Sequence, residues 1–291
     1  MNDVYGVDPC APTSAIELIH LLRLFGPSEG RFIADFPMDW IAEVRSSIGE
    51  DHPMAQARAL EWLHRRRHAL VETRHRYLPG RTWPENAAAL HDEVRALIGA
   101  RGCAPTQMSI DEALHDVDAI ADASGAQIPR TREAYLSAAW PVLGISAKVV
   151  LVDPYFRLRG LDGPRRAQAA RQKDVLVALL AEAQRRRKVE VFRIYVSCHS
   201  ALEGDPQGTE FENDLRRAAA AAGIRDISLE YDVLEDLAAT RQHARYLLGR
   251  GCGIQFDHGF DTARDGSTNH VHWLKAAELT PLLERFDLPD A

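Results

Sequence analysis

Apolar residues in the second half of the chain gather in short runs that alternate with longer amphipathic stretches. Three of these runs are almost continuously apolar, and the first ends in Asp153-Pro154. Such runs are typical of strands that are buried on both faces of a sheet. Helix-length segments begin between them, near Pro164 and near Thr209. The alternation predicts an α/β fold with a central sheet covered by helices, and the expected strands are residues 147–156, 189–198 and 226–233.

Shorter apolar segments follow, and the chain closes with a helix expected from Ala276 to Phe286. The segments read "ARYLLG", "GIQFDHG" and "HVHWL", and we expect them to add strands to the same sheet. Ligands of α/β sheets bind beyond the carboxyl ends of strands. Asp153 and Tyr155 stand at such an end, so we expect them at the rim of a site.

The first half of the chain has a helical pattern. Thr13 or Ser14 can cap a helix that stops at Gly26-Pro27. Apolar residues at steps of three and four predict a second helix from Pro53 to Tyr77, and only "GRFIADFP" is expected to be extended. Residues 1–128 are therefore expected to form a mainly helical domain of unknown role, and residues 129–291 the α/β domain, with further N-terminal helices over 85–98 and 109–123.

Composition is that of a soluble globular protein. The 291 residues suffice for two domains, and hydrophobic residues make up 46% of them. The N-terminal residues lack a signal-peptide pattern, and no apolar run reaches the length that spans a bilayer, so we expect a cytoplasmic protein without a transmembrane segment. The four cysteines have no C-x-x-C spacing. They indicate neither a disulfide framework nor a thiolate zinc site.

Charge is unevenly distributed. The net charge of −7 argues against a protein whose whole surface binds nucleic acid. The segment Glu61–Arg81 is locally basic, with six arginines against two glutamates, and Arg65, Arg66 and Arg67 are consecutive. These arginines are candidates for contacting a nucleic-acid backbone. The alternative is a solvated helix face with no ligand.

His243 and Arg245 form the most informative pair in the sequence. Two residues apart on a strand, they point to the same face. An arginine can donate two hydrogen bonds to phosphate oxygens, and a neutral histidine can attack phosphorus or transfer a proton. The pair therefore favours a phosphate site. The alternative is two half-exposed strand residues, with Arg245 paired to a nearby acid.

The order of strands and helices, together with "VVLVDPYF" and "HARYLLGRGCGIQFDHGFD", resembles phospholipase D-like proteins. The similarity is to a bacterial branch related to the C-terminal domain of MIT-domain proteins. It covers about residues 130–286, beginning with "TREAYLSAAWPVLGISAKVVLVDPYF". The resemblance implies a mixed sheet flanked by helices.

The resemblance also implies a mechanism that needs neither metal nor cofactor. Active members use two His-x-Lys motifs: one histidine becomes a phosphohistidine and the other protonates the leaving oxygen. Carried over, His243 is the nucleophile or the acid and Arg245 holds the phosphate, and a single motif implies a homodimer. Supporting catalytic candidates are His258 and Asp153, and substrate-binding candidates are Tyr155, Asp261, Arg65, Arg66 and Arg67.

This chain departs from the family motif at several points. Arg245 stands where the family has lysine, and Arg250 where it has aspartate. "GSTN", residues 266–269, has the letters of the family's Gly-Ser-x-Asn but comes nine residues late. We interpret it mainly as a turn, with the displaced motif as the alternative.

The sequence favours a metal-independent phosphodiesterase, a nuclease rather than a lipid enzyme, of the kind found in bacterial defence or DNA-modification systems. The N-terminal domain would then recruit substrate or a partner protein. Two alternatives stay open: an inactive module that binds phosphate or nucleic acid, and a scaffold subunit of a multi-protein complex.

Two further histidines, His270 and His272, share one face of an expected strand. The sequence offers no obvious third ligand to accompany them. We therefore interpret them as sheet-packing residues and expect no metal site.

Overall fold

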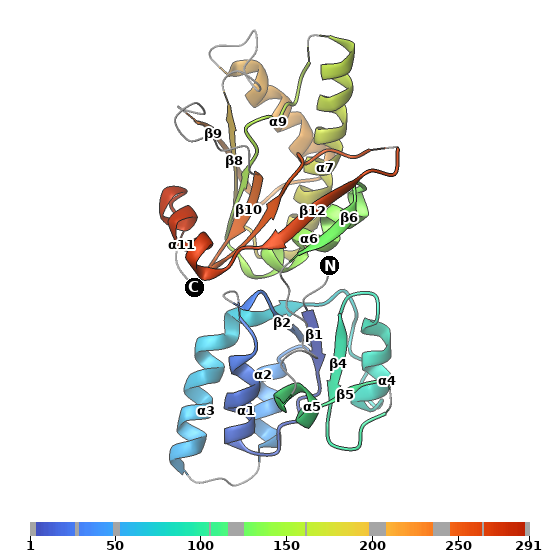
Figure 1. The fold of residues 1–291 in the computed structure, drawn as a ribbon, viewed down its shortest axis with the longest axis vertical. Helices are drawn as coiled ribbons and strands as arrows, with labels where there is room; N and C mark the ends of the chain where they lie inside the picture. The colour runs from blue at the N-terminus through green and yellow to red at the C-terminus, as the bar shows by residue number, and fades with distance from the viewer. Residues whose placement is uncertain are drawn as a thin grey trace. The chain divides into compact units, whose positions relative to one another are not determined.

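A computed structural model describes residues 4–26, 29–48, 53–104, 106–115, 125–160, 162–197, 208–234, 245–263 and 265–288 of the chain. The chain divides into two compact units, Asn2–Ala123 and Ser124–Ala291 (Figure 1). Within the described ranges, no helix is both long enough and apolar enough to cross a membrane.

The N-terminal unit is built on a parallel sheet in the order β3-β2-β1-β4-β5. Its strands are short, and the central one, β1, is buried along its whole length. Connections between parallel neighbours must cross over a face of the sheet, which places the helices on the faces. The strands are β1 (Val4–Val7), β2 (Phe32–Asp35), β3 (Leu70–Glu72), β4 (Ala96–Gly99) and β5 (Met108–Ser109).

Helices cover both faces of this sheet. Four of them bury their apolar sides in one cluster with Tyr5, Val7 and Ile33, and on the opposite face Gly6 lies against Trp83 of the fifth. Ser14 caps the first helix, because its Oγ accepts from the Glu17 N–H at 3.2 Å. The four are α1 (Ala15–Arg23), α2 (Trp40–Ser47), α3 (Pro53–Arg66) and α5 (Ile110–His115); the fifth is α4 (Trp83–Ala87), and the 3-10 turns are η2 (Arg67–Ala69) and η3 (Ala88–Leu90).

The expectation of a mainly helical N-terminal domain is corrected by this sheet. The helix expected over 53–77 ends at Arg66, and Leu70 begins β3. The stretch expected as a helix over 85–98 holds the short α4, η3 and then β4. Strands of two to four residues are too short to show an alternating pattern, so their apolar residues fit a helical period equally well.

The C-terminal unit has a seven-stranded mixed sheet in the order β6-β12-β11-β10-β7-β8-β9. The strands β7, β8 and β9 are parallel, whereas β10 runs antiparallel to β7 and continues an antiparallel series through β11 and β12 to β6. The strands are β6 (Ala126–Pro129), β7 (Lys148–Val152), β8 (Val191–Ser197), β9 (Ser228–Leu234), β10 (Arg245–Gly249), β11 (Cys252–Phe256) and β12 (Thr268–Trp273).

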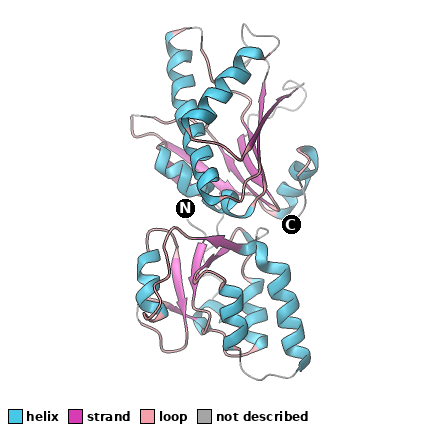
Figure 2. Cartoon of the chain, turned by 180° about the vertical axis from the view of Figure 1, so that it is seen from behind, coloured by secondary structure: helices cyan, strands magenta, loops and turns pink. Residues whose placement is uncertain are grey.

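Helices cover both faces here as well (Figures 1 and 2). On one face Tyr135 packs against Phe256 and Phe260. On the other face Val150 and Leu248 share a cluster with the last helix. The first face carries α6 (Arg132–Ile145), α7 (Gly163–Arg186) and α9 (Thr209–Ala221), and the second carries α11 (Ala276–Arg285).

The α/β fold class predicted from the sequence is confirmed. β6 is not among the strands that the sequence pattern predicts. It is an edge strand that ends in Pro129, and proline is tolerated at an edge because one side of an edge strand needs no ladder hydrogen bonds.

We predict that Leu18→Ala destabilises the N-terminal unit by about 2 to 5 kcal/mol, because the side chain is fully buried and its removal leaves a cavity. Ile16 lies on the same helix and is 59% exposed, so Ile16→Ala should change the free energy of unfolding by less than about 0.5 kcal/mol. Denaturant titration of both variants measures the difference. Equal losses would contradict the assignment of the buried face.

Candidate functional site

The candidate site lies where β7 ends and β10 begins. The two strands are antiparallel, with Tyr246 opposite Val152, so the first residue of β10 comes beside the residue that follows β7. These residues are Arg245 and Asp153. The sheet therefore brings together two candidates that are ninety-two positions apart in the sequence, at the carboxyl end of the parallel strands, where ligands of such sheets bind.

Arg245 is held from three sides. Its Nε lies 3.6 Å from Asp153 Oδ1, and its Nη1 donates a hydrogen bond of 2.7 Å to the Asp257 carbonyl. The guanidinium carbon sits 5.0 Å from the centre of the Tyr155 ring, a cation–π contact. The side chain is 17% exposed. Its position is thus fixed while part of it still reaches solvent.

Asp153 is fully buried. Its carboxylate accepts from the backbone N–H groups of Tyr155, at 2.9 Å, and Phe260, at 3.3 Å. Burial raises the pKa of Asp153 to about 6, and the neighbouring Arg245 charge and the two backbone hydrogen bonds oppose that rise. The group therefore exchanges its proton close to neutral pH, where a carboxyl group at the surface is already ionised.

The loop 257–261 closes over this pair. A Cβ on Gly259 would come within 3.2 Å of Asp153 Oδ2, so any larger residue here would press on the carboxylate. The Tyr135 hydroxyl lies within hydrogen-bonding distance of the carbonyl oxygens of Gly259 and Asp261, at 3.0 and 3.1 Å. Burial raises the pKa of Tyr135, which keeps this donor protonated.

Asn269 is a positioning residue that the sequence analysis did not select. It is fully buried, and its side-chain amide bonds both backbone groups of His258: Oδ1 accepts from the N–H at 2.9 Å, and Nδ2 donates to the C=O at 3.0 Å. Nδ2 also donates to the Tyr135 hydroxyl at 3.2 Å. In the sequence this residue is the fourth letter of "GSTN", the segment that leads into β12.

Asp261 has a partner on each side. Its carboxylate is buried, forms an ion pair with Arg130, and lies 3.5 Å from Arg171 Nη2. Both arginines line a surface hollow of about 610 Å³ together with Thr262 and Asp265. Asp261 therefore orients two cations at the edge of the site, and its own oxygens are engaged within the protein.

The remaining candidates are placed as follows. His258 is exposed in the loop 257–261, and His243 lies outside the described residues. Arg65, Arg66 and Arg67 belong to the N-terminal unit, where Arg65 pairs with Glu61 and Arg66 stacks on Trp62.

The N-terminal unit has a reversal of strand order of its own, between β1 and β4. Asp8 directly follows β1 and donates its backbone N–H to the Ile98 carbonyl at 2.9 Å. Burial raises the pKa of Asp8, against a hydrogen bond from the Cys10 N–H. In open parallel sheets such a reversal leaves a crevice at the carboxyl ends of the strands.

The C-terminal arrangement can bind an anion and exchange a proton. Arg245 supplies a fixed positive charge, and Asp153 beside it is a carboxyl group that is neutral below about pH 6. A nucleophile for phosphorus must come from another residue, and His243 stands two positions before Arg245 in the chain.

Comparison with known proteins leaves the chain without an assigned family. No protein family and no curated protein matches it. Among solved structures, one of TrmBL2, an archaeal chromatin protein described as showing a novel mode of DNA binding, is 11% identical over 61% of this chain and 57% of that protein, with a TM-score of 0.27.

We predict that Asn269→Ala lowers the free energy of unfolding by about 1 to 3 kcal/mol, because it leaves the two backbone groups of His258 without their partner. The control is Thr268→Ala, one position earlier and exposed. Its hydroxyl bonds Gln127 in contact with water, so its loss should cost less than about 0.5 kcal/mol. Chemical denaturation measures both. A loss no larger for Asn269 than for Thr268 would refute the positioning role.

Proposed function

We propose that this protein is a phospholipase D-like phosphodiesterase that cleaves nucleic acid without a metal. The observation that carries the proposal is the Arg245 guanidinium, fixed at the carboxyl end of β7 by Asp153 and by the Asp257 carbonyl and stacked on Tyr155. The family resemblance implies a mixed sheet flanked by helices, and the seven-stranded mixed sheet of the C-terminal unit supports the proposal.

In the proposed reaction, an imidazole nitrogen of His243 attacks phosphorus and the bond to the leaving oxygen breaks. A second histidine protonates that oxygen. Water then attacks the phosphohistidine and gives its proton back to the second histidine. The P–N bond breaks, which restores His243 and releases the phosphate product. Arg245 binds the non-bridging oxygens throughout, where negative charge increases in the transition state.

The second histidine is His243 of another copy, so the active form is a homodimer with one phosphate between two sites. The N-terminal unit recruits the substrate or a partner protein, with Arg65, Arg66 and Arg67 facing the nucleic-acid backbone. We place the protein in the cytoplasm of a bacterium, in a defence or DNA-modification system.

A second function is favoured by one feature of the site. Arginine replaces the family's lysine, and its guanidinium already bonds a backbone carbonyl and faces a carboxyl group. An arginine held in this way is better suited to binding a phosphate than to stabilising its changing geometry during cleavage. The alternative is thus a module that binds nucleic acid, or a scaffold subunit, without cleavage.

The decisive experiment is cleavage of labelled single- and double-stranded DNA and RNA in EDTA. We expect activity in the wild type, at least a hundredfold loss in His243→Ala, since alanine cannot attack phosphorus, and a comparable loss in Arg245→Ala. His91→Ala is the control, because His91 is an exposed histidine of the N-terminal unit.

Two results would overturn the enzyme assignment. One is cleavage that is equal in wild type and His243→Ala. The other is the absence of cleavage in the wild type and in every variant, together with nucleic-acid binding that weakens in Arg245→Ala. That result would establish the binding module instead.

Binding of a short oligonucleotide should tighten as pH falls from 7.5 to 5.5. Its phosphodiesters keep their charge over this range, whereas Asp153 becomes protonated near pH 6 and ceases to compete for Arg245. In Asp153→Asn the part of the pH dependence centred near 6 should disappear. Fluorescence anisotropy across the range measures it, and an unchanged profile in the variant would exclude Asp153 as the titrating group.

A further inference from the structure

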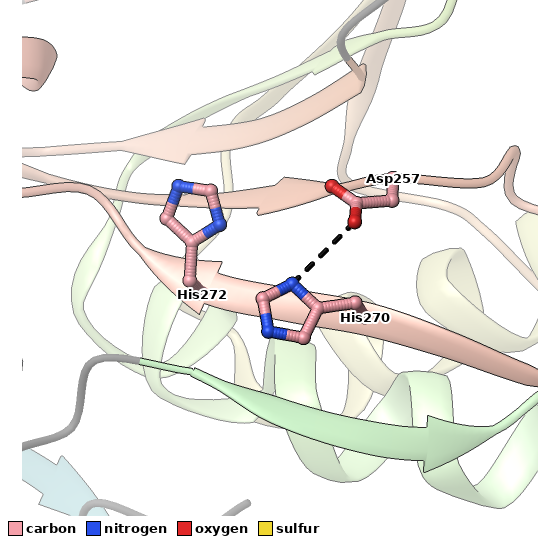
Figure 3. Close-up of side chains that lie close together, drawn as sticks. All are labelled: Asp257, His270 and His272. Carbon is pink, nitrogen blue, oxygen red and sulfur yellow. Dashed lines mark ion pairs between the residues drawn. The ribbon is translucent and has the colours of Figure 1, made fainter.

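Asp257, His270 and His272 form a cluster at the end of β11 and on β12 (Figure 3). They share the face of the sheet that carries α11, because Gln255 pairs with Tyr246, which packs in the α11 cluster. Asp257 follows the last residue of β11, and the two histidines alternate on β12. Gln255 pairs with His272 across the two strands, so alternation puts Asp257 on the same face as both imidazoles. Phe256, between them in the chain, packs against Tyr135 on the opposite face.

The three side chains present one ligand atom each within a small volume. These atoms all lie within 4.8 Å of one another, and His270 Nδ1 is 3.5 Å from Asp257 Oδ2. The two imidazole rings are 6.1 Å apart and inclined by 41°. A zinc ion with ligands at about 2.0 to 2.2 Å needs its ligand atoms about 3.3 to 3.5 Å apart. Small rotations of side chains that are about half exposed close that gap.

The backbone beneath the cluster is fixed by the sheet. The Asp257 N–H donates to the His270 carbonyl at 3.0 Å, and the strand pairing continues through Gln255 and His272. Ligands on neighbouring strands keep their spacing without an ion, so binding orders only side chains. On this face α11 packs over β7 and β10, in one cluster with Val150 and Leu248, and His270 is exposed.

Two imidazoles and one carboxylate are a donor set for borderline divalent metals such as zinc and cobalt, whereas calcium and magnesium favour sites made wholly of oxygen. We propose that Asp257, His270 and His272 bind one Zn²⁺-class ion, with water at its open position. The sequence interpretation of these histidines as sheet-packing residues lacked the third ligand, which the turn after β11 supplies.

The site is distinct from the proposed phosphate site yet joined to it through one residue. The Asp257 carbonyl accepts from Arg245 on one side of the strand, while the Asp257 carboxylate faces the histidines. An ion on the carboxylate would hold the start of the loop 257–261 in place. The proposal does not depend on catalysis, and its test measures metal binding alone.

The test is titration of the untagged, EDTA-stripped chain with Co²⁺, followed by displacement with Zn²⁺. We expect one Co²⁺ per chain with a visible d–d absorption band and without the near-ultraviolet band of thiolate ligands. His270→Ala, His272→Ala and Asp257→Asn should each weaken binding by at least about tenfold. The metal should raise the unfolding temperature of the wild type and not that of the variants.

The matched control is His91→Ala, which removes a surface histidine lying 2.9 Å from a carboxylate oxygen of Asp92, outside the cluster. Its affinity should equal that of the wild type. Circular dichroism spectra of the metal-free variants that match the wild type would show that weaker metal binding does not come from unfolding. The proposal is overturned if the wild type binds no Co²⁺, if the cluster variants bind as tightly as the control, or if the spectrum shows thiolate ligation.

Discussion

Everything at the candidate site depends on the burial of Asp153. A carboxylate with no exposed surface is costly unless charge and hydrogen bonds compensate it. Here the compensation comes from Arg245 and from two backbone N–H groups, one of which belongs to Phe260 in the loop after β11. These contacts with the Asp153 carboxylate therefore position both the Arg245 side chain and the loop 257–261. The proposed phosphate site and the buried end of β7 therefore rest on the same contacts.

That arrangement requires the reversal of direction within the sheet. If β10 ran parallel to β7, its first residue would lie at the opposite end of the strands, and Asp153 would lose its contact with Arg245. The antiparallel series then returns β11 to the same end of the sheet, so that Gly259 passes over the carboxylate and the Asp257 carbonyl accepts a hydrogen bond from Arg245. Asn269 on β12 fixes the backbone of this loop from the buried side. The site is assembled from strand ends that meet only in the folded sheet.

Sequence patterns predicted the elements with the longest signals. The pattern predicted the continuous apolar runs that form β7, β8 and β9 and the helices between them. It also selected Asp153 and Arg245 as separate site candidates, without predicting their contact. The N-terminal sheet was not, because strands such as β5, of two residues, carry no period. The sequence also could not predict contacts that depend on strand register, such as Asn269 with His258 and Asp257 with His270. They follow from the way β11 pairs with β12. His243 stays a prediction, because it lies outside the described residues.

The central claim is that a buried carboxyl group and a phosphate share Arg245. It is tested most directly by carbon-13 NMR titration of the Asp153 carboxyl group, with and without a saturating phosphodiester oligonucleotide. The account predicts a pKa of about 6 in the free protein and a higher value in the complex, because a bound anion disfavours a second negative charge beside it. A pKa near the ordinary aspartate value of about 3.9, unchanged by the oligonucleotide, would contradict it.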